Sequence, residues 1–158
     1  MPALQASSIA TIVKFGYPAT LVRDFDYWTV LARPQQATLG ALIVCAKEPV
    51  TRFADLSAEA FAELKQITTI IEHGLGALWH FDKINYLMLM MVDSDVHFHV
   101  IPRYAAGRAF EGIACVDAGW PGVPRLDVVN AIDGSAFETL VVRLRGQCAP
   151  TPEQPGTP

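Results

Sequence analysis

The sequence has few cysteines, no cluster of positive charge and no long apolar run. Its three cysteines, Cys45, Cys115 and Cys148, are widely spaced and form no Cys-x-x-Cys pair, which argues against a disulfide framework or structural zinc site and for a reducing compartment. The twelve Lys and Arg residues are scattered, so no broad nucleic-acid surface is expected. No stretch reaches the roughly 18 apolar residues of a membrane span, and the N-terminus lacks a secretory signal pattern. We therefore expect a soluble, cytoplasmic protein that binds neither nucleic acid nor membrane.

The chain is long and apolar enough to form one domain. It has 158 residues, 51% of them hydrophobic, and a formal net charge of −4. A length and composition of this kind predict a single domain with a sizeable core, over residues 1–148. Residues 149–158 are rich in Pro, Thr and Gly, which predicts a disordered tail.

The first half of the chain predicts strands followed by a long helix. Two β-favouring runs, 21–23 and 27–32, flank an Asp-rich turn and predict a hairpin. The short, continuously apolar run 41–45 predicts a strand that is buried on both faces. Ser57 then has the character of a helix N-cap, and apolar residues recur every three or four positions as far as Leu78, which predicts an amphipathic helix.

The second half predicts two more strands and a less regular extension. The longest apolar run, 84–92, is followed after Asp93-Ser94 by a second strand that begins near residue 95. Residues 111–125 are rich in turn formers and predict irregular structure, and 135–145 predicts a short helix. This order predicts an α+β fold, in which an antiparallel sheet is covered on one face by one long helix and followed by a C-terminal extension.

The strand near residue 95 carries the residues with the clearest chemistry. Residues 95–104 read DVHFHVIPRY. Because successive side chains of a strand alternate between faces, His97 and His99 share one face, and Asp95 is expected on that face too. Imidazole can act as a nucleophile, a proton carrier or a metal ligand near neutral pH, so this row is a candidate reaction centre.

The same residues resemble a known family. The His-φ-His-φ-φ-Pro-Arg run that begins at His97 is similar to the histidine triad (HIT) motif His-φ-His-φ-His-φ-φ, with Asp95 in place of the first histidine. The resemblance covers about 20–108 and is strongest over 85–103, which leaves 109–148 as an extension to the family core. It implies the HIT fold and a homodimer in which two sheets join edge to edge.

The resemblance also implies roles for these residues. His97 matches the histidine that attacks the α-phosphorus of a nucleotide and forms a nucleotidyl-histidine intermediate, and His99 matches a histidine that supports the site through hydrogen bonds. For Asp95 we hypothesise that its carboxylate orients His97 or His99, as an acidic residue orients a catalytic imidazole. The Gly-Gln-Ser/Thr element of the family corresponds here to Met90-Met91-Val92, which offers no side-chain donor.

Four further polar residues are candidates for substrate binding. Arg103 follows the histidine strand, Asn85 begins the neighbouring strand, and Arg33 and Gln36 lie in a loop predicted to face the site. An arginine fork suits the geometry of a phosphate group. Asn85 suits a ribose hydroxyl or a backbone group.

The sequence thus predicts a nucleotide phosphohydrolase or nucleotidyltransferase that acts through His97 on a phosphoanhydride or phosphoramidate bond of a nucleotide or another phosphorylated small molecule. No cofactor or resident metal is expected, although a divalent cation can accompany the substrate. One alternative is a weakened, nucleotide-binding or dimeric interaction module, because the phosphate-contacting donors are missing. A second alternative is a metal site formed by Asp95, His97 and His99.

Overall fold

The computed structural model describes residues 2–150 of the chain. Of the tail predicted to be disordered, residues 151–158 lie outside this described part. Within residues 2–150 no helix is both long enough and apolar enough to cross a membrane.

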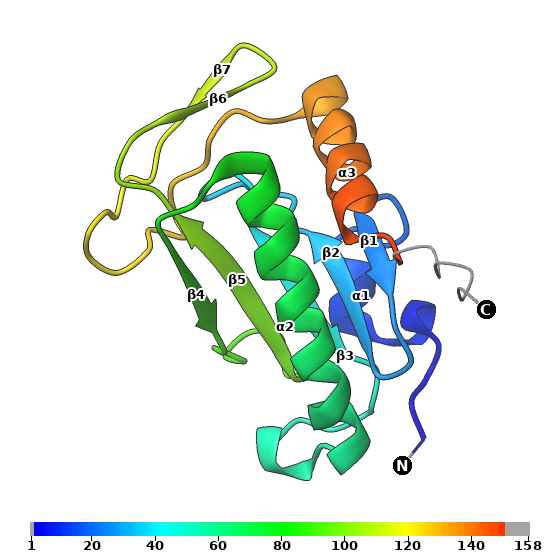
Figure 1. Cartoon of the computed structure of the whole chain (residues 1–158). Helices are drawn as coiled ribbons and strands as arrows, with labels where there is room; N and C mark the ends of the chain where they lie inside the picture. Colours follow the sequence, from blue (N-terminus) through cyan, green and yellow to red (C-terminus); the bar gives the residue numbers. More distant parts are fainter. Residues whose placement is uncertain (1, 151–158) are drawn as a thin grey trace, which may run out of the picture.

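A five-stranded antiparallel sheet forms the centre of the molecule (Figure 1). Its strands lie in the order β1 (Leu21–Asp24), β2 (Trp28–Ala32), β3 (Leu42–Ala46), β5 (His97–Arg103) and β4 (Lys83–Leu87). The hairpin and the buried strand are as predicted from the sequence. The strand predicted over 84–92 is shorter, because the chain leaves the sheet after Leu87 and Met90 adopts a positive φ of 48°.

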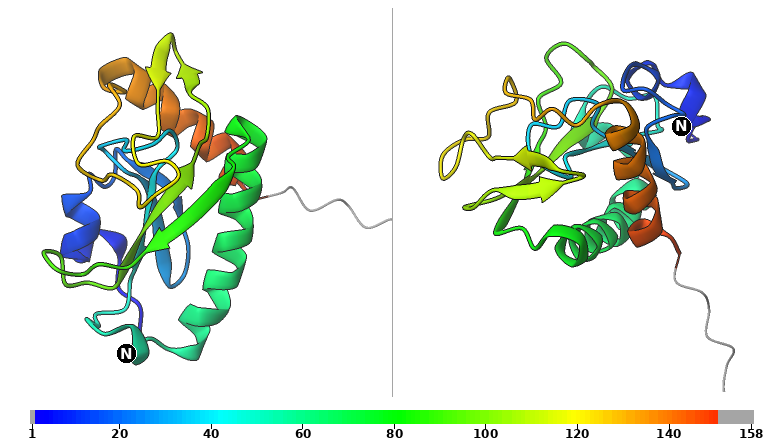
Figure 2. Two further views of the ribbon diagram at one scale, coloured as in Figure 1. Left: turned by 90° about the vertical axis from the view of Figure 1, so that its left-hand side faces the viewer. Right: turned by 90° about the horizontal axis from the view of Figure 1, so that it is seen from above.

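Two helices cover one face of this sheet (Figures 1 and 2). The long helix α2 (Ala58–Trp79) begins where Ser57 Oγ accepts the N–H of Ala60 at 3.1 Å, as the N-cap prediction requires. The C-terminal helix α3 (Gly134–Cys148) packs beside α2 and against β1. The α+β fold class with an antiparallel sheet is confirmed, with a second helix on the same face.

The N-terminal segment covers part of the opposite face (Figure 2). A 3₁₀ turn, η1 (Ala6–Ser8), and the short helix α1 (Ala10–Lys14) pack on apolar side chains of β2 and β3, among them Leu31, Ile43 and Cys45. Strand β3 is therefore buried on both faces by its own chain. The short α1 has too few residues to show a helical period, so the sequence did not reveal this cover.

The extension after the sheet contains more regular structure than predicted. A two-stranded hairpin, β6 (Arg108–Phe110) and β7 (Ile113–Cys115), begins it, so the region predicted to be irregular starts within a hairpin. A second 3₁₀ turn, η2 (Phe53–Asp55), precedes α2. The segment between β7 and α3 returns to the loop after β2, where the Asn130 amide donates to the backbone carbonyls of Gln36 and Ala37.

Candidate active site

His97 and His99 lie on the sheet face that α2 does not cover, and they border a cavity of about 410 Å³. The alternation of side chains along β5 places both imidazoles there, as predicted. The other walls come from α1 and its end, from the loop after β2 and from the loop between β4 and β5; their lining residues are Lys14, Phe15, Arg33, Gln35, Leu89, Met90, Met91, Val92 and Asp93, with Leu126 from the extension.

The environment of His97 fixes which ring nitrogen carries its proton. The side chain is 2% exposed, and Nδ1 lies 2.7 Å from the backbone carbonyl oxygen of Asp95. A carbonyl oxygen can only accept, so Nδ1 is the protonated nitrogen and donates to it. Nε2 keeps its lone pair and makes no hydrogen bond with the described residues. An imidazole held in this form can act as a nucleophile through Nε2.

His99 lies beside His97 and is neutral at physiological pH. The two ring centroids are 5.2 Å apart, and Phe15 packs at 5.9 to 6.0 Å from both. Burial lowers the pKa of His99 to about 4, and the electrostatic effects of His97 and Arg33 act in the same direction, against the opposing effect of Asp93. Its Nδ1 is buried and has no partner within residues 2–150.

Asp95 does not contact the imidazoles through its carboxylate. Its Oδ2 accepts two hydrogen bonds from Thr11 of α1, from the backbone N–H at 3.1 Å and from the hydroxyl at 2.8 Å. The hypothesis that the Asp95 carboxylate orients an imidazole is therefore wrong. Asp95 does orient His97, but through its backbone carbonyl oxygen. Asp95 lies in a bend before β5 begins at His97, so the strand alternation does not extend to it.

The structure does not assemble the alternative metal site either. Among the described residues, no group of three or more His, Cys, Asp or Glu side chains is placed to hold a metal ion. Asp95 turns its carboxylate to α1 and leaves His97 and His99 as a pair.

Of the two loop residues predicted to bind substrate, only Arg33 lines the cavity. Gln36 is fully buried, and its amide donates to the carbonyls of Arg33 and Ala41 while its oxygen accepts the N–H of Gly40 at 2.8 Å. It shapes the loop and has no free group for a ligand. Its neighbour Gln35 lines the cavity instead.

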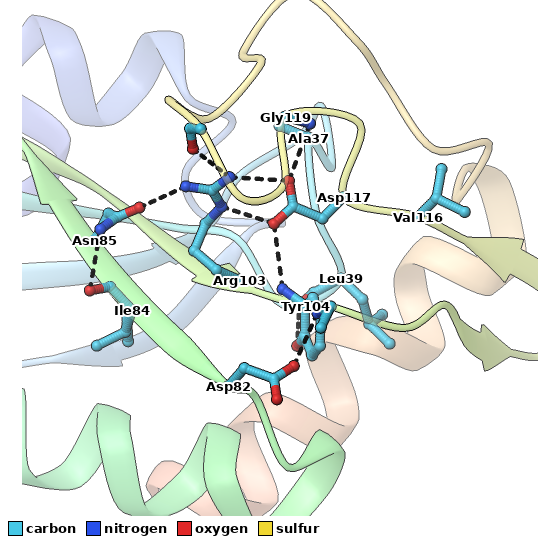
Figure 3. Close-up of polar contacts among 12 residues, drawn as sticks. Ala37, Leu39, Asp82, Ile84, Asn85, Arg103, Tyr104, Val116, Asp117 and Gly119 are labelled. Carbon is cyan, nitrogen blue, oxygen red and sulfur yellow. Dashed lines mark hydrogen bonds and ion pairs between the residues drawn. The ribbon is translucent and has the colours of Figure 1, made fainter.

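Arg103 and Asn85 are engaged with each other and with the extension (Figure 3). Arg103 Nε donates to Asp117 at 2.7 Å, Nη2 donates to the Gly122 carbonyl at 2.8 Å, and Nη1 donates to Asn85 Oδ1 at 2.8 Å. The side chains of Arg103 and Asp117 are 5% and 1% exposed. This geometry contradicts the prediction that Arg103 is available to bind phosphate, since Asp117 already neutralises its charge. Pairing with an acidic residue was the structural alternative for Arg103, but its partner Asp117 lies in the extension, where no periodicity places it.

Comparisons with known proteins identify the family to which this fold belongs. The family model described as HIT domain matches residues 15–106, more than half of the chain. The protein therefore belongs to the HIT family. No curated protein sequence matches it significantly.

Solved structures of HIT proteins share the fold at low sequence identity. A histidine triad protein from Sinorhizobium meliloti 1021 is 17% identical, with a TM-score of 0.69, over 90% of this chain and 99% of that one. One from Bradyrhizobium japonicum is 16% identical, with a TM-score of 0.65, over 94% and 99%. A diadenosine triphosphate hydrolase from Plasmodium falciparum is 10% identical, with a TM-score of 0.58, over 82% and 76%.

Proposed function

We propose that this protein is a nucleotide phosphohydrolase or nucleotidyltransferase that acts through a nucleotidyl-histidine intermediate on His97. The observation that carries the proposal is the hydrogen bond from His97 Nδ1 to the Asp95 carbonyl, which leaves the Nε2 lone pair free beside a cavity of about 410 Å³. Membership of the HIT family supports a nucleotide as ligand. One structural relative is named as a diadenosine triphosphate hydrolase.

The reaction follows from the state of the two imidazoles. His97 Nε2 attacks the α-phosphorus, the bond from that phosphorus to the leaving group breaks, and Nε2 becomes bonded to phosphorus. Water then attacks the same phosphorus and loses a proton, the P–N bond breaks with its electron pair returning to Nε2, and the nucleoside monophosphate is released. If another hydroxyl compound attacks instead, the nucleotidyl group is transferred to that compound. His99 is neutral and acts beside the phosphate as a hydrogen-bond partner, not as a second cation.

The proposal needs no resident cofactor, and a divalent cation can accompany the substrate phosphates. We also propose that the protein works in the cytoplasm and as a homodimer. Its three cysteines are free and buried, which fits a reducing compartment.

Intact-protein mass spectrometry tests the covalent step. After incubation with a dinucleoside triphosphate, a rapid quench in alkaline denaturant, which preserves the P–N bond, should reveal a mass increase of one nucleoside monophosphoryl group. His97→Gln should abolish both the adduct and turnover, whereas His73→Gln, which changes an exposed histidine on α2, should keep both. An active His97→Gln protein would rule out this mechanism.

One observation favours a weaker second candidate, a module that binds nucleotides without turning them over. The cavity wall at Met90, Met91 and Val92 presents apolar side chains, and Met91 and Val92 are 87% and 86% exposed. Such a wall cannot donate hydrogen bonds to a developing negative charge. Nucleotide binding measured by calorimetry, without adduct or turnover in the unaltered protein, would establish this candidate instead.

A further inference from the structure

A second space adjoins the cavity beside the histidines at Arg33. This second space has a volume of about 240 Å³ and is lined by Lys14, Phe15, Arg33, Pro34 and Gln35. Four of those residues also line the histidine cavity. Arg33 therefore stands at the junction of the two spaces, where a substrate that reacts at His97 would extend.

Arg33 is a buried cation that the protein leaves without an acidic partner. It is 8% exposed, Nη1 donates to the Gln35 carbonyl, and Nε has no partner within residues 2–150. None of the ion pairs of this described part includes Arg33. Burial lowers the pKa of its guanidinium. A buried charge without a counter-ion is costly, and a negative group of a ligand would remove that cost.

The other charges at the junction do not compensate Arg33. Lys14 and Asp93 both line the histidine cavity, but they form an ion pair with each other at 2.6 Å. Together they leave the single positive charge of Arg33 unopposed. An arginine in this state suits the oxygens of a phosphate group.

The same site is poor in groups that could protonate a leaving group. His97 uses Nδ1–H on the Asp95 carbonyl, and His99 carries no extra proton near neutral pH because its pKa is about 4. An amine must gain a proton as it leaves phosphorus. A phosphate leaves as a stable anion and needs none.

We propose that Arg33 binds the phosphate next to the one under attack, so that the substrates are nucleotides with a phosphoanhydride bond and an anionic leaving group. This inference rests on the proposed function. In the step concerned, the bond between the α-phosphorus and the bridging oxygen breaks, its electron pair stays on that oxygen, and the departing phosphate remains against the Arg33 guanidinium.

Matched substrates and matched variants test the leaving group. Diadenosine triphosphate and adenosine 5′-phosphoramidate transfer the same adenylyl group and differ in the group that leaves. We expect kcat/KM to be at least tenfold higher for the triphosphate. Arg33→Gln should lower kcat/KM for the triphosphate by about 10- to 100-fold, which corresponds to the loss of a charge-assisted hydrogen bond. The same variant should change kcat/KM for the phosphoramidate by less than threefold.

Two controls accompany these measurements. Arg52→Gln removes one positive charge from a side chain that is 76% exposed, outside both cavities, and should leave both rates unchanged. Arg33→Lys keeps the charge and should recover part of the triphosphate rate. A preference for the phosphoramidate, or an equal loss on both substrates in Arg33→Gln, would overturn the inference.

Binding and stability measurements separate this inference from the proposed function. Even if no substrate is turned over, ADP should bind more tightly than AMP in calorimetry, and Arg33→Gln should remove that difference. Equal affinity of the unaltered protein for ADP and AMP would overturn the inference by itself.

Arg33→Gln should also melt at the same or a higher temperature than the unaltered protein, because it removes an uncompensated buried charge. A large fall in the melting temperature would show that Arg33 stabilises the fold and would overturn the inference.

Discussion

His99 is buried as a neutral base, and this makes the stability of the protein depend on pH. The groups that act on it are His97 and Arg33, which oppose its protonation, and Asp93, which favours it. Its pKa is about 4 in the folded protein and about 6.5 in the unfolded chain. Between those values the unfolded chain binds the additional proton, so the free energy of unfolding falls as the pH is lowered.

We therefore expect the unfolding free energy to fall by about 2 kcal/mol more between pH 7.5 and pH 5 than in His99→Asn, which cannot titrate. Urea unfolding at the two pH values measures this difference. His73→Asn, which alters an exposed histidine, is the control and should keep the full loss. If His99→Asn loses as much stability on acidification as the unaltered protein, the burial of His99 is not the cause.

Residue type and spacing predicted the histidines but not the partners of the other site residues. The period of a strand is enough to place His97 and His99 on one face. Asp95 and Gln36 were misjudged because their partners are Thr11, far away in sequence, and backbone groups of a folded loop. Arg33 was predicted as a ligand, and its position at the cavity supports that interpretation without testing it.

At the scale of elements, helix α1 depends on Asp95. The helix has only five residues, and Asp95 satisfies both the N–H and the hydroxyl of Thr11 in it. We expect Asp95→Ala to destabilise the protein by about 1–3 kcal/mol, because buried donors lose their acceptor. Thr11→Val should cost less, and the double variant should cost less than the sum of the two, because the two side chains share one interaction.

Thermal and urea unfolding of the unaltered protein, the two single variants and the double variant gives the coupling energy between Thr11 and Asp95. Activity provides a second measurement, since α1 carries Lys14 and precedes Phe15, which packs on both imidazoles. Additive losses in the cycle would show that the Thr11–Asp95 contact contributes nothing to the docking of α1.

The extension is attached to the sheet by a buried ion pair. Asp117 neutralises Arg103 at the end of β5, and both side chains are almost completely buried. Asp117→Asn should lower the unfolding free energy by about 3–5 kcal/mol, because it leaves Arg103 charged and unpaired. Asp127→Asn, whose partner Arg125 is exposed, is the matched control and should have no measurable effect. Equal stability of the two variants would contradict this account of the pair.

The elements themselves were largely predictable, and their ends were not. Periodicity and the Ser57 cap identified β1, β2, β3 and α2 because these are long or strongly apolar. Apart from Asn85 the run 84–92 is apolar, yet the chain leaves the sheet after Leu87. Composition cannot distinguish a strand from an apolar loop that lines a cavity, and residues 89–92 form such a loop.

At the scale of the whole molecule, the sheet ends in an open edge. Within residues 2–150 strand β4 pairs with β5 alone, and an unpaired edge favours pairing with another chain. Strand β3 adds nothing to such an interface, because the chain buries it by itself. Three of the exposed apolar side chains, Leu89, Met91 and Val92, follow β4 directly.

We expect a two-fold dimer that uses the β4 edge. Light scattering at micromolar concentration should give a mass near twice 17.2 kDa. Met91→Glu, which places a charge among the exposed apolar residues after β4, should shift the equilibrium toward the monomer, whereas Val142→Glu, on an exposed position of α3, should not. A monomeric mass for the unaltered protein would contradict the expectation.

The contact between Thr11 and Asp95 also has a consequence for the order of events during synthesis. Helix α1 leaves the ribosome early, but its two anchors, Asp93 and Asp95, follow 79 and 84 residues after Lys14 and Thr11. Five residues are too few to persist as an isolated helix in water. Strands β2 and β3 can offer the helix an apolar surface earlier, but its polar anchors form only after the histidine strand has been made, so we expect the cavity wall to be completed late in the folding of the growing chain.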